Sequence, residues 1–529
     1  MLEVLPARSG KPTARIGGMY LHSPYDPEEE ARRFAEGAPA GEDPSTVLLL
    51  GAELGYAGRA ILRRFPSARL LAAYYDPQIA AAGTAACGGQ DAWHPACGQT
   101  LLEFLRARLD ELSAEGLAVL EWPASARLFP RESLAAQRQT AQLLRELRGG
   151  LATAAAVGRR WLRNSLDNFL GLDRVLSPSL PGGGLPVVIA ASGPSLEAAL
   201  PALGRLRTGF SIWALPSAAE CLTAHGLQPD LVVLTDPCWY GLAHLSAVAS
   251  AAFPVAMPLS AAAGAWNLAG GVMLIAQDAP YENELLAAAG YPGPRVLPQG
   301  TVAASAMQLA LRSTRREVIF AGLDFCFRDL SGHARPNLFE RSLEAGSGRL
   351  EPLHHRRFTW ALEQAPRRLP GGGRSGLALQ TYAGWFASRP PEDRLYRLLP
   401  SEVPLPGLRP LDNDGLERLT RGSPPARAPG RGAGPQEGYP DRAARRWLLL
   451  DRLSSWRQLA AGLPARGADL SADPLLFSLA YHFDAARLAE LRRVARTHGP
   501  RAAAPKAESL AADLGAFLEG RRARLEAAP

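Results

Sequence analysis

The sequence predicts an α/β protein with a Rossmann-like N-terminal domain, a central α/β domain with a mostly parallel sheet, and a C-terminal helical domain. Three observations support this fold class. Short apolar runs alternate with helical patterns through the first 410 residues, as in parallel sheets joined by crossover helices. Several of these runs end in a glycine turn or an acid. From residue 442 onward only helical spacing of apolar residues remains.

The chain has 529 residues, enough for two or three domains. We expect the following division: a Rossmann-like α/β domain over 1–130, a helical connector over 131–180, the central domain over 181–410, a flexible linker over 411–440, and a helical domain over 441–529. The linker is predicted because residues 422–440 are rich in Pro, Gly, Ala and Arg and lack periodicity. The C-terminal helices are predicted to serve interaction or oligomerisation.

The N-terminal domain begins with a strand over Val47–Gly51, a glycine turn, a helix over 57–65, and a second strand that ends at Asp76. This unit resembles the first βαβ unit of S-adenosylmethionine-dependent methyltransferases. There the glycines would approach the cofactor and Asp76 would bind ribose hydroxyls. The Gly-x-x-x-Gly spacing of Gly51 and Gly55 differs from the tighter fingerprint, and no catalytic methyltransferase motif follows. These departures favour a Rossmann-like domain without a working cofactor site.

The central domain opens with a buried strand over Val187–Ala191, which stops at Ser192, Gly193, Pro194 and Ser195. A helix over 196–206 follows. Gly193 permits a sharp turn, and Ser192 or Ser195 can cap the helix. Free amides at such a strand–turn–helix junction attract phosphate. The alternative is a turn that only changes the direction of the chain.

Two further segments follow the same plan. A strand near 229–237 ends at Thr235 and Asp236, and Gly300 and Thr301 stand at the amino end of a helix. The strand over 317–325 contains Asp324, and His333 lies nine positions beyond it in a Ser-Gly-His loop. The carboxyl ends of parallel strands meet at one edge of a sheet, where ligands bind. We therefore expect these side chains on one rim.

Five ordered motifs carry a family resemblance: Ser192–Leu196, Thr235–Pro237, Gly300–Val302, Gly322–Phe325 and Gly332–His333. Together they resemble the domain shared by archaeal 6-hydroxymethylpterin diphosphokinases and bacterial motility accessory factor glycosyltransferases. Leu21–Pro27 and the spacing of Trp161, Asn164 and Asn168 are similar to the longer bacterial members. Leu323 departs from the pattern, since a polar residue, often Gln, is common there, and Thr301 replaces a common Ser.

The resemblance to the glycosyltransferases implies transfer of a nonulosonic acid sugar from a CMP-sugar to Ser or Thr of an acceptor such as flagellin. Amides at Gly193–Ser195 and Gly300–Thr301 would stabilise the leaving phosphate. Asp236, Asp324 and His333 are the catalytic candidates, one of which would take the proton of the acceptor hydroxyl. The large flanking domains favour this hypothesis, because a protein acceptor needs a surface to bind.

Two alternatives remain open. The chain could transfer diphosphate from ATP to a hydroxymethylpterin, with Asp236 and Asp324 holding Mg²⁺. It could also be a non-catalytic scaffold or interaction protein. The glycosyltransferase hypothesis names no cofactor besides the CMP-sugar donor, and it leaves a requirement for Mg²⁺ open.

Composition limits the function classes. The net charge is 58 − 51 = +7, the arginines are scattered, and no nucleic-acid-binding motif is present, so we expect no nucleic-acid partner. No apolar run of about 18 residues predicts a membrane span, and the first 18 residues lack a signal-type apolar region. Five widely spaced cysteines suit a reducing cytoplasm. Expected partners are a nucleotide-sugar and a flagellin-like protein, with a homo-oligomer left open.

Overall fold

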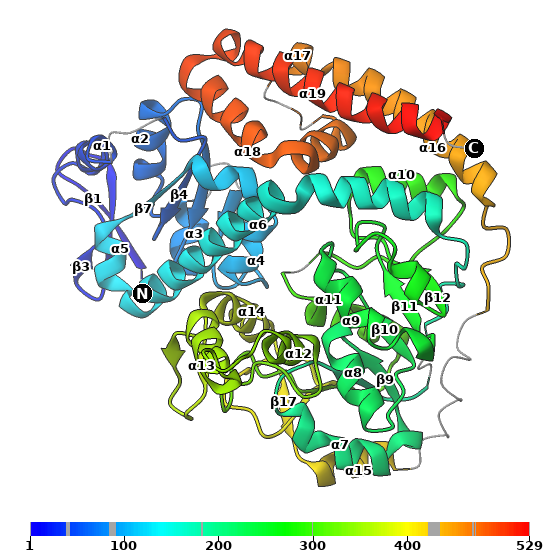
Figure 1. Ribbon diagram of the computed structural model, residues 1–529. Coiled ribbons are helices and arrows are strands. Elements are labelled where there is room, and N and C mark those ends of the chain that lie inside the picture. Colours follow the sequence, from blue (N-terminus) through cyan, green and yellow to red (C-terminus); the bar gives the residue numbers. More distant parts are fainter. Residues whose placement is uncertain are drawn as a thin grey trace. The chain divides into compact units, whose positions relative to one another are not determined.

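The computed structural model describes residues 2–38, 43–83, 91–180, 184–298, 300–421, 434–467, 470 and 472–527 (Figure 1). The chain forms two compact units. Unit 1 comprises Met1–Ala156, Gly462–Ala472 and Asp484–Ala512, and unit 2 comprises Val157–Ala461, Asp473–Phe483 and Asp513–Pro529. Residues 441–529, expected as a separate domain, are therefore divided between the two units.

The residues described for unit 1 form a four-stranded parallel sheet of order β6-β5-β4-β7 and a three-stranded antiparallel sheet of order β1-β2-β3. The sequence patterns above did not predict the antiparallel sheet. The strands are β1 (Leu2–Pro6), β2 (Pro12–Ile16), β3 (Met19–Tyr20), β4 (Thr46–Leu50), β5 (Arg69–Ala73), β6 (Ala92–Trp93) and β7 (Leu117–Glu121). The helices that lie within this unit are α1 (Pro27–Glu36), α2 (Tyr56–Arg64), α3 (Pro77–Gly83), α4 (Leu101–Arg106) and α5 (Pro123–Leu128).

The described part of unit 2 contains an eight-stranded sheet of order β12-β11-β10-β9-β8-β13-β16-β17, and all of its pairings are parallel. Its strands are β8 (Val187–Ala190), β9 (Ser211–Ala214), β10 (Leu231–Val233), β11 (Pro254–Met257), β12 (Gly271–Leu274), β13 (Val318–Ala321), β16 (Leu395–Leu398) and β17 (Arg409–Leu411). A short antiparallel hairpin joins β14 (Arg367–Arg368) to β15 (Arg374–Ser375).

Helices alternate with these strands, as crossover connections in a parallel sheet require. They are α7 (Leu196–Arg205), α8 (Pro216–Ala224), α9 (Trp239–Ser246), α10 (Pro280–Ala288), α11 (Val302–Ser313), α12 (Leu338–Ala345), α13 (Leu353–Gln364), α14 (Leu377–Ala387) and α15 (Asn413–Thr420). Buried side chains of α11, such as Met307, pack with Ile189 of β8 and Phe320 of β13 in one core. The sheet is thus covered by a helix at its centre.

The direction of chain progression reverses at β8. Strands β9 to β12 extend the sheet on one side of β8, while β13, β16 and β17 extend it on the other. In open parallel sheets such a reversal leaves a crevice at the carboxyl ends of the two central strands, and ligands bind there. The turns that follow β8 and β13 are therefore where a ligand site is expected.

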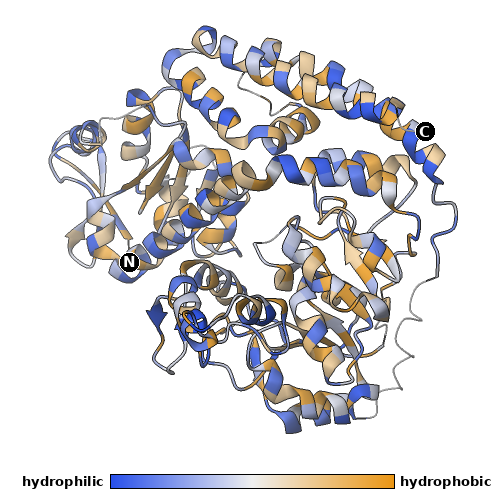
Figure 2. Cartoon of the chain, viewed as in Figure 1, coloured by the Kyte–Doolittle hydropathy of each residue, from blue (hydrophilic) through white to orange (hydrophobic). Residues whose placement is uncertain are grey.

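The remaining helices are long. They are α6 (Pro130–Gly171), α16 (Arg442–Ala461), α17 (Leu463–Arg466), α18 (Pro474–His498) and α19 (Pro500–Ala527). Hydrophilic and hydrophobic residues alternate along α16 and α19 in Figure 2. In α16, Leu449, Leu453, Trp456 and Ala460 are buried at helical spacing, whereas Trp447 is 67% exposed. The predicted fold class is confirmed: Rossmann-like, then parallel α/β, then helical. Within the described ranges, no helix is long and apolar enough to cross a membrane.

Candidate functional site

The crevice between β8 and β13 is occupied by the side chain of Asp324. Its Oδ2 accepts a hydrogen bond from the Ser195 backbone N–H at 2.7 Å, and its Oδ1 accepts one from the Ser195 hydroxyl at 2.5 Å. Both residues are buried, each 5% exposed. Burial raises the pKa of Asp324, while the two bonds from Ser195 act to lower it. Asp324 therefore ties the turn after β8 to the loop after β13.

The expectation of free amides at the Ser192–Ser195 turn is wrong for the two residues that were to supply them. The Gly193 N–H donates to Gly322 O at 2.8 Å, the Ser195 N–H is taken by Asp324, and Pro194 has no N–H. The Ser195 hydroxyl also donates to Asp324 and does not cap α7. A carboxylate of the protein itself thus stands where a phosphate was expected.

Gly193 is required by this close approach. A Cβ at position 193 would lie 2.5 Å from Gly322 O and 2.6 Å from Asp324 Oδ2. Distances this short cannot be tolerated, so any side chain would push the turn and Asp324 apart. The glycine serves the contact between the two loops as well as the turn.

A second group of predicted residues gathers around Asp236, which with Thr235 follows β10. Asp236 Oδ1 accepts a hydrogen bond from the Cys238 N–H at 2.7 Å. Burial raises the pKa of Tyr382 on α14, and the charge of Asp236 raises it further. Burial also lowers the pKa of His244 on α9, an effect that the Asp236 charge opposes. Asp236 is therefore close to two titratable residues that the sequence analysis did not select.

Gly300 and Thr301 belong to the same group as Asp236 and Tyr382. A Cβ at position 300 would lie 3.4 Å from the ring of Tyr382, and Thr301 is the N-cap of α11, its hydroxyl accepting from the Ala303 N–H at 3.3 Å. Because α11 leads into the parallel strand β13, its amino end lies at the carboxyl edge of the sheet. The positive end of the helix dipole therefore lies near Tyr382 and Asp236, and an anion there would be stabilised.

His333 belongs to the loop that follows β13. The Ala334 N–H donates to Ser192 O at 2.7 Å, and the ring of His333 packs on Phe339 with centroids 4.7 Å apart. Burial, aided by the charge of His244, lowers the pKa of His333 to about 4. Its Nδ1 is buried and has no hydrogen-bond partner among the described residues. His333 is thus neutral at pH 7 and a weaker base than an ordinary histidine.

The two acids do not form the expected shared pair. Asp236 follows β10 and Asp324 follows β13, and β9 and β8 lie between these strands. Three strand spacings amount to about 14 Å. Both oxygens of Asp324 are engaged by Ser195. The strand order and these bonds therefore do not support one Mg²⁺ held by both Asp236 and Asp324, and the described residues contain no group of three His, Cys, Asp or Glu that could hold a metal.

Asn164 and Asn168 of α6 position the rim. The Asn164 side-chain amide donates to Pro237 O at 3.0 Å and Ser260 O at 3.2 Å. The Asn168 amide donates to Leu259 O at 2.7 Å and Ala261 O at 2.9 Å. These asparagines, four residues apart and on one face of the helix, fix the loops after β10 and β11. These hydrogen bonds give a structural reason for asparagine at both positions of the Trp161, Asn164 and Asn168 spacing.

The glycine turn of unit 1 is also filled by protein atoms. Both carboxylate oxygens of buried Glu53 accept hydrogen bonds from the first amides of α2, those of Tyr56 and Ala57. A Cβ at Gly51 would lie 2.6 Å from Ser125 Cβ. Asp76 Oδ1 accepts from the Gln78 N–H at 2.7 Å and so caps α3. Protein groups therefore take hydrogen-bonding positions at the turn where a cofactor was considered.

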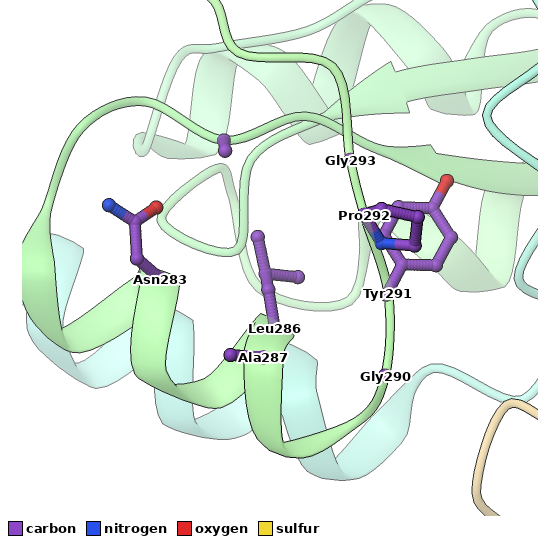
Figure 3. A pocket seen from close by; sticks show the side chains of 8 residues that line it. Asn283, Leu286, Ala287, Gly290, Tyr291, Pro292 and Gly293 are labelled. Carbon is purple, nitrogen blue, oxygen red and sulfur yellow. The ribbon is translucent and has the colours of Figure 1, made fainter.

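A pocket of about 380 Å³ lies beside α10 at the β12 edge of the sheet (Figure 3). It is lined by Ala276, Asn283, Leu286, Ala287, Gly290, Tyr291, Pro292 and Gly293. The view shows Asn283, Leu286 and Ala287 on one helix and Tyr291 to Gly293 on the adjoining loop. None of the residues selected from the sequence lines this pocket, so we do not assign the chemistry to it.

The central part of the chain is similar to a known protein family. Residues 159–330 match the family described as 6-hydroxymethylpterin diphosphokinase MptE-like. An MptE-like domain is therefore present over these residues. The matched residues include the crevice at β8 and β13, Asp236 and Thr301, whereas Tyr382 lies beyond them.

Two uncharacterized proteins from Treponema pallidum (strain Nichols) are similar in sequence. One is 25% identical over 304 residues, 57% of this chain and 64% of its own length. The other is 28% identical over 111 residues, 21% of this chain and 52% of its own length. The matched stretches thus span between half and two thirds of these relatives.

A solved structure shares the fold. It is the MAf glycosyltransferase from Magnetospirillum magneticum AMB-1, with a TM-score of 0.51, 13% identity, and coverage of 100% of this chain and 93% of that one. At this identity the likeness concerns the fold alone. The chain therefore shares its fold with this solved structure.

Proposed function

We propose that this protein is a glycosyltransferase of the motility accessory factor type. It would move a nonulosonic acid sugar from a CMP-sugar to a Ser or Thr hydroxyl of a flagellin-like acceptor protein. The observation that carries this proposal is the convergence of Asp236, Tyr382 and the amino end of α11 on one rim of the sheet that includes the MptE-like domain. The fold shared with a MAf glycosyltransferase supports it.

The chemistry assigns different roles to the two sides of the rim. The acceptor oxygen attacks the anomeric carbon, the bond from that carbon to the phosphate oxygen breaks, and CMP leaves with the electron pair. The amino end of α11, at Thr301 and Val302, stabilises the charge on the leaving phosphate. Asp236 takes the proton of the acceptor hydroxyl. Asp324 keeps the crevice closed instead of reacting, because Ser195 engages both its oxygens.

Ligand binding separates this proposal from its rivals. CMP at a hundred times its dissociation constant should stabilise the protein by about 2.7 kcal/mol, measured as a thermal shift. S-adenosylmethionine should give no shift, because Glu53 fills the amino end of α2. A shift with ATP, Mg²⁺ and a hydroxymethylpterin but none with CMP would favour the diphosphokinase. No shift with any of these compounds would favour a scaffold.

Two variants locate the phosphate. Thr301→Asp keeps a good N-cap but places a carboxylate at the anion position, so CMP binding should be lost while the fold is retained. Thr301→Asn is the matched control, because it caps equally well without charge and should bind CMP. Equal CMP binding by both variants would exclude the amino end of α11 as the phosphate site.

A further inference from the structure

Two large aromatic side chains beside Asp236 are exposed. Trp239 is 64% exposed and Tyr240 is 51% exposed, and they form the first two residues of α9. Only Pro237 and Cys238 separate them from Asp236. Exposed neighbouring aromatic residues at a predicted binding rim indicate contact with a ligand more strongly than isolated surface residues do.

The two rings are held in place from one side. The rings of Trp239 and Tyr240 meet at an angle of 64° with centroids 5.6 Å apart, and Tyr240 lies 5.7 Å from Phe339. Phe339 also packs on His333 and stacks on Trp360. The preceding loop is fixed by the bond from Cys238 N–H to Asp236 and by Asn164 on Pro237 O. Little conformational entropy would therefore be lost when a flat ligand stacks on this pair.

One cation lies beside the segment that carries the rings. The Arg160 guanidinium donates to Cys238 Sγ at 3.0 Å, and no carboxylate pairs with Arg160 in the ranges the structure describes. A cation beside aromatic rings suits the negative charge and the flat base of a nucleotide.

We propose that Trp239 and Tyr240 form a stacking subsite for the heteroaromatic base of the donor nucleotide. This inference rests on the proposed function and adds to it the residues that bind the base. Stacking tolerates any base, so the subsite contributes affinity, and choice among bases comes from other contacts. An acceptor peptide is the rival occupant, and the experiment below distinguishes the two.

Isothermal titration of CMP and of ribose 5-phosphate tests the subsite, because only CMP carries a base. Trp239→Ala should weaken CMP binding about 5- to 140-fold and leave the affinity for ribose 5-phosphate unchanged. Trp239→Phe keeps an aromatic ring and should stay within a few-fold of the unmodified protein. Trp447→Ala, which removes an exposed tryptophan of α16, should bind both ligands normally.

Three results would overturn the inference. CMP affinity could be unchanged in Trp239→Ala, or both ligands could weaken equally. The variant could also raise the KM for acceptor protein with CMP affinity unchanged, which would show that the rings bind the acceptor protein. A protein that binds CMP but fails these tests leaves the proposed function standing, whereas an unmodified protein that does not bind CMP removes both.

Discussion

At the scale of single residues, the contact between Ser195 and Asp324 changes the chemical role expected of both. A carboxylate at the end of a strand resembles a catalytic acid in sequence, and a serine in a Gly-Pro turn resembles a phosphate ligand. In the structure each satisfies the other through two hydrogen bonds inside the protein. Buried polar groups with such partners stabilise the fold, and removing one partner leaves the other unsatisfied.

We predict that Asp324→Asn lowers the free energy of unfolding by about 1–3 kcal/mol, because its amide N–H₂ would face one of the two Ser195 donors. Ser195→Ala should also cost about 1–3 kcal/mol, since it leaves Asp324 Oδ1 buried without its hydroxyl donor, although the backbone bond stays intact. Urea unfolding measures both values. An Asp324→Asn protein that is as stable as the unmodified chain but inactive would show that Asp324 is catalytic instead.

At the scale of elements, the close approach of two loops decides which glycines are needed. Gly193 precedes α7, and its missing side chain allows the loop after β13 to contact the turn after β8. Gly204 lies in α7 itself, and a Cβ there would have no atom within 4 Å. The two positions are close in sequence, yet their surroundings impose opposite requirements.

Gly193→Ala should therefore destabilise the protein by several kcal/mol or prevent folding, as overpacking at a rigid contact does. Gly204→Ala should stabilise it by up to about 1 kcal/mol, because alanine loses less backbone entropy in a helix. Thermal unfolding of the two variants side by side measures this difference. Similar melting temperatures for both would contradict the packing of the crevice described above.

At the scale of the whole molecule, stability should depend on pH through two half-buried histidines of unit 2. Burial lowers the pKa of His333 to about 4 and likewise lowers the pKa of His482 to about 4. The His482 Nδ1 lies 2.7 Å from Ser478 O. In the unfolded chain both histidines titrate near pH 6.5. Their contribution to stability is fully present above pH 6.5 and is lost as the pH falls towards 4.

The unfolded chain takes up these two protons first, so the free energy of unfolding should fall by up to about 1.4 kcal/mol per pH unit for each histidine. Urea unfolding between pH 7.5 and 4.5 measures the slope. The double variant His333→Gln and His482→Gln should show a shallower slope than the unmodified protein, since other groups titrate equally in both. Identical slopes would mean that the fold does not lower the pKa values of these histidines.

The sequence by itself determined the fold class and the rim. Apolar runs such as Val187–Ala191 and the helical spacing of α11 are local patterns, and local patterns fix strands, helices and their order. A parallel sheet then requires that Ser192–Ser195 and Thr235–Asp236 lie at one edge, which the strand pairings confirm. The roles of the site residues in binding and catalysis stay predictions.

Only the tertiary structure decided which polar groups meet. Ser195 and Asp324 are 129 positions apart, and no pattern around either residue indicates that they bond to each other. Tyr382 and His244 join Asp236 for the same reason, through strand order and helix packing. Hydrogen bonding and burial depend on neighbours in space. A chemical role inferred from a sequence motif therefore requires that no other group of the protein already bonds to the polar atoms of that motif.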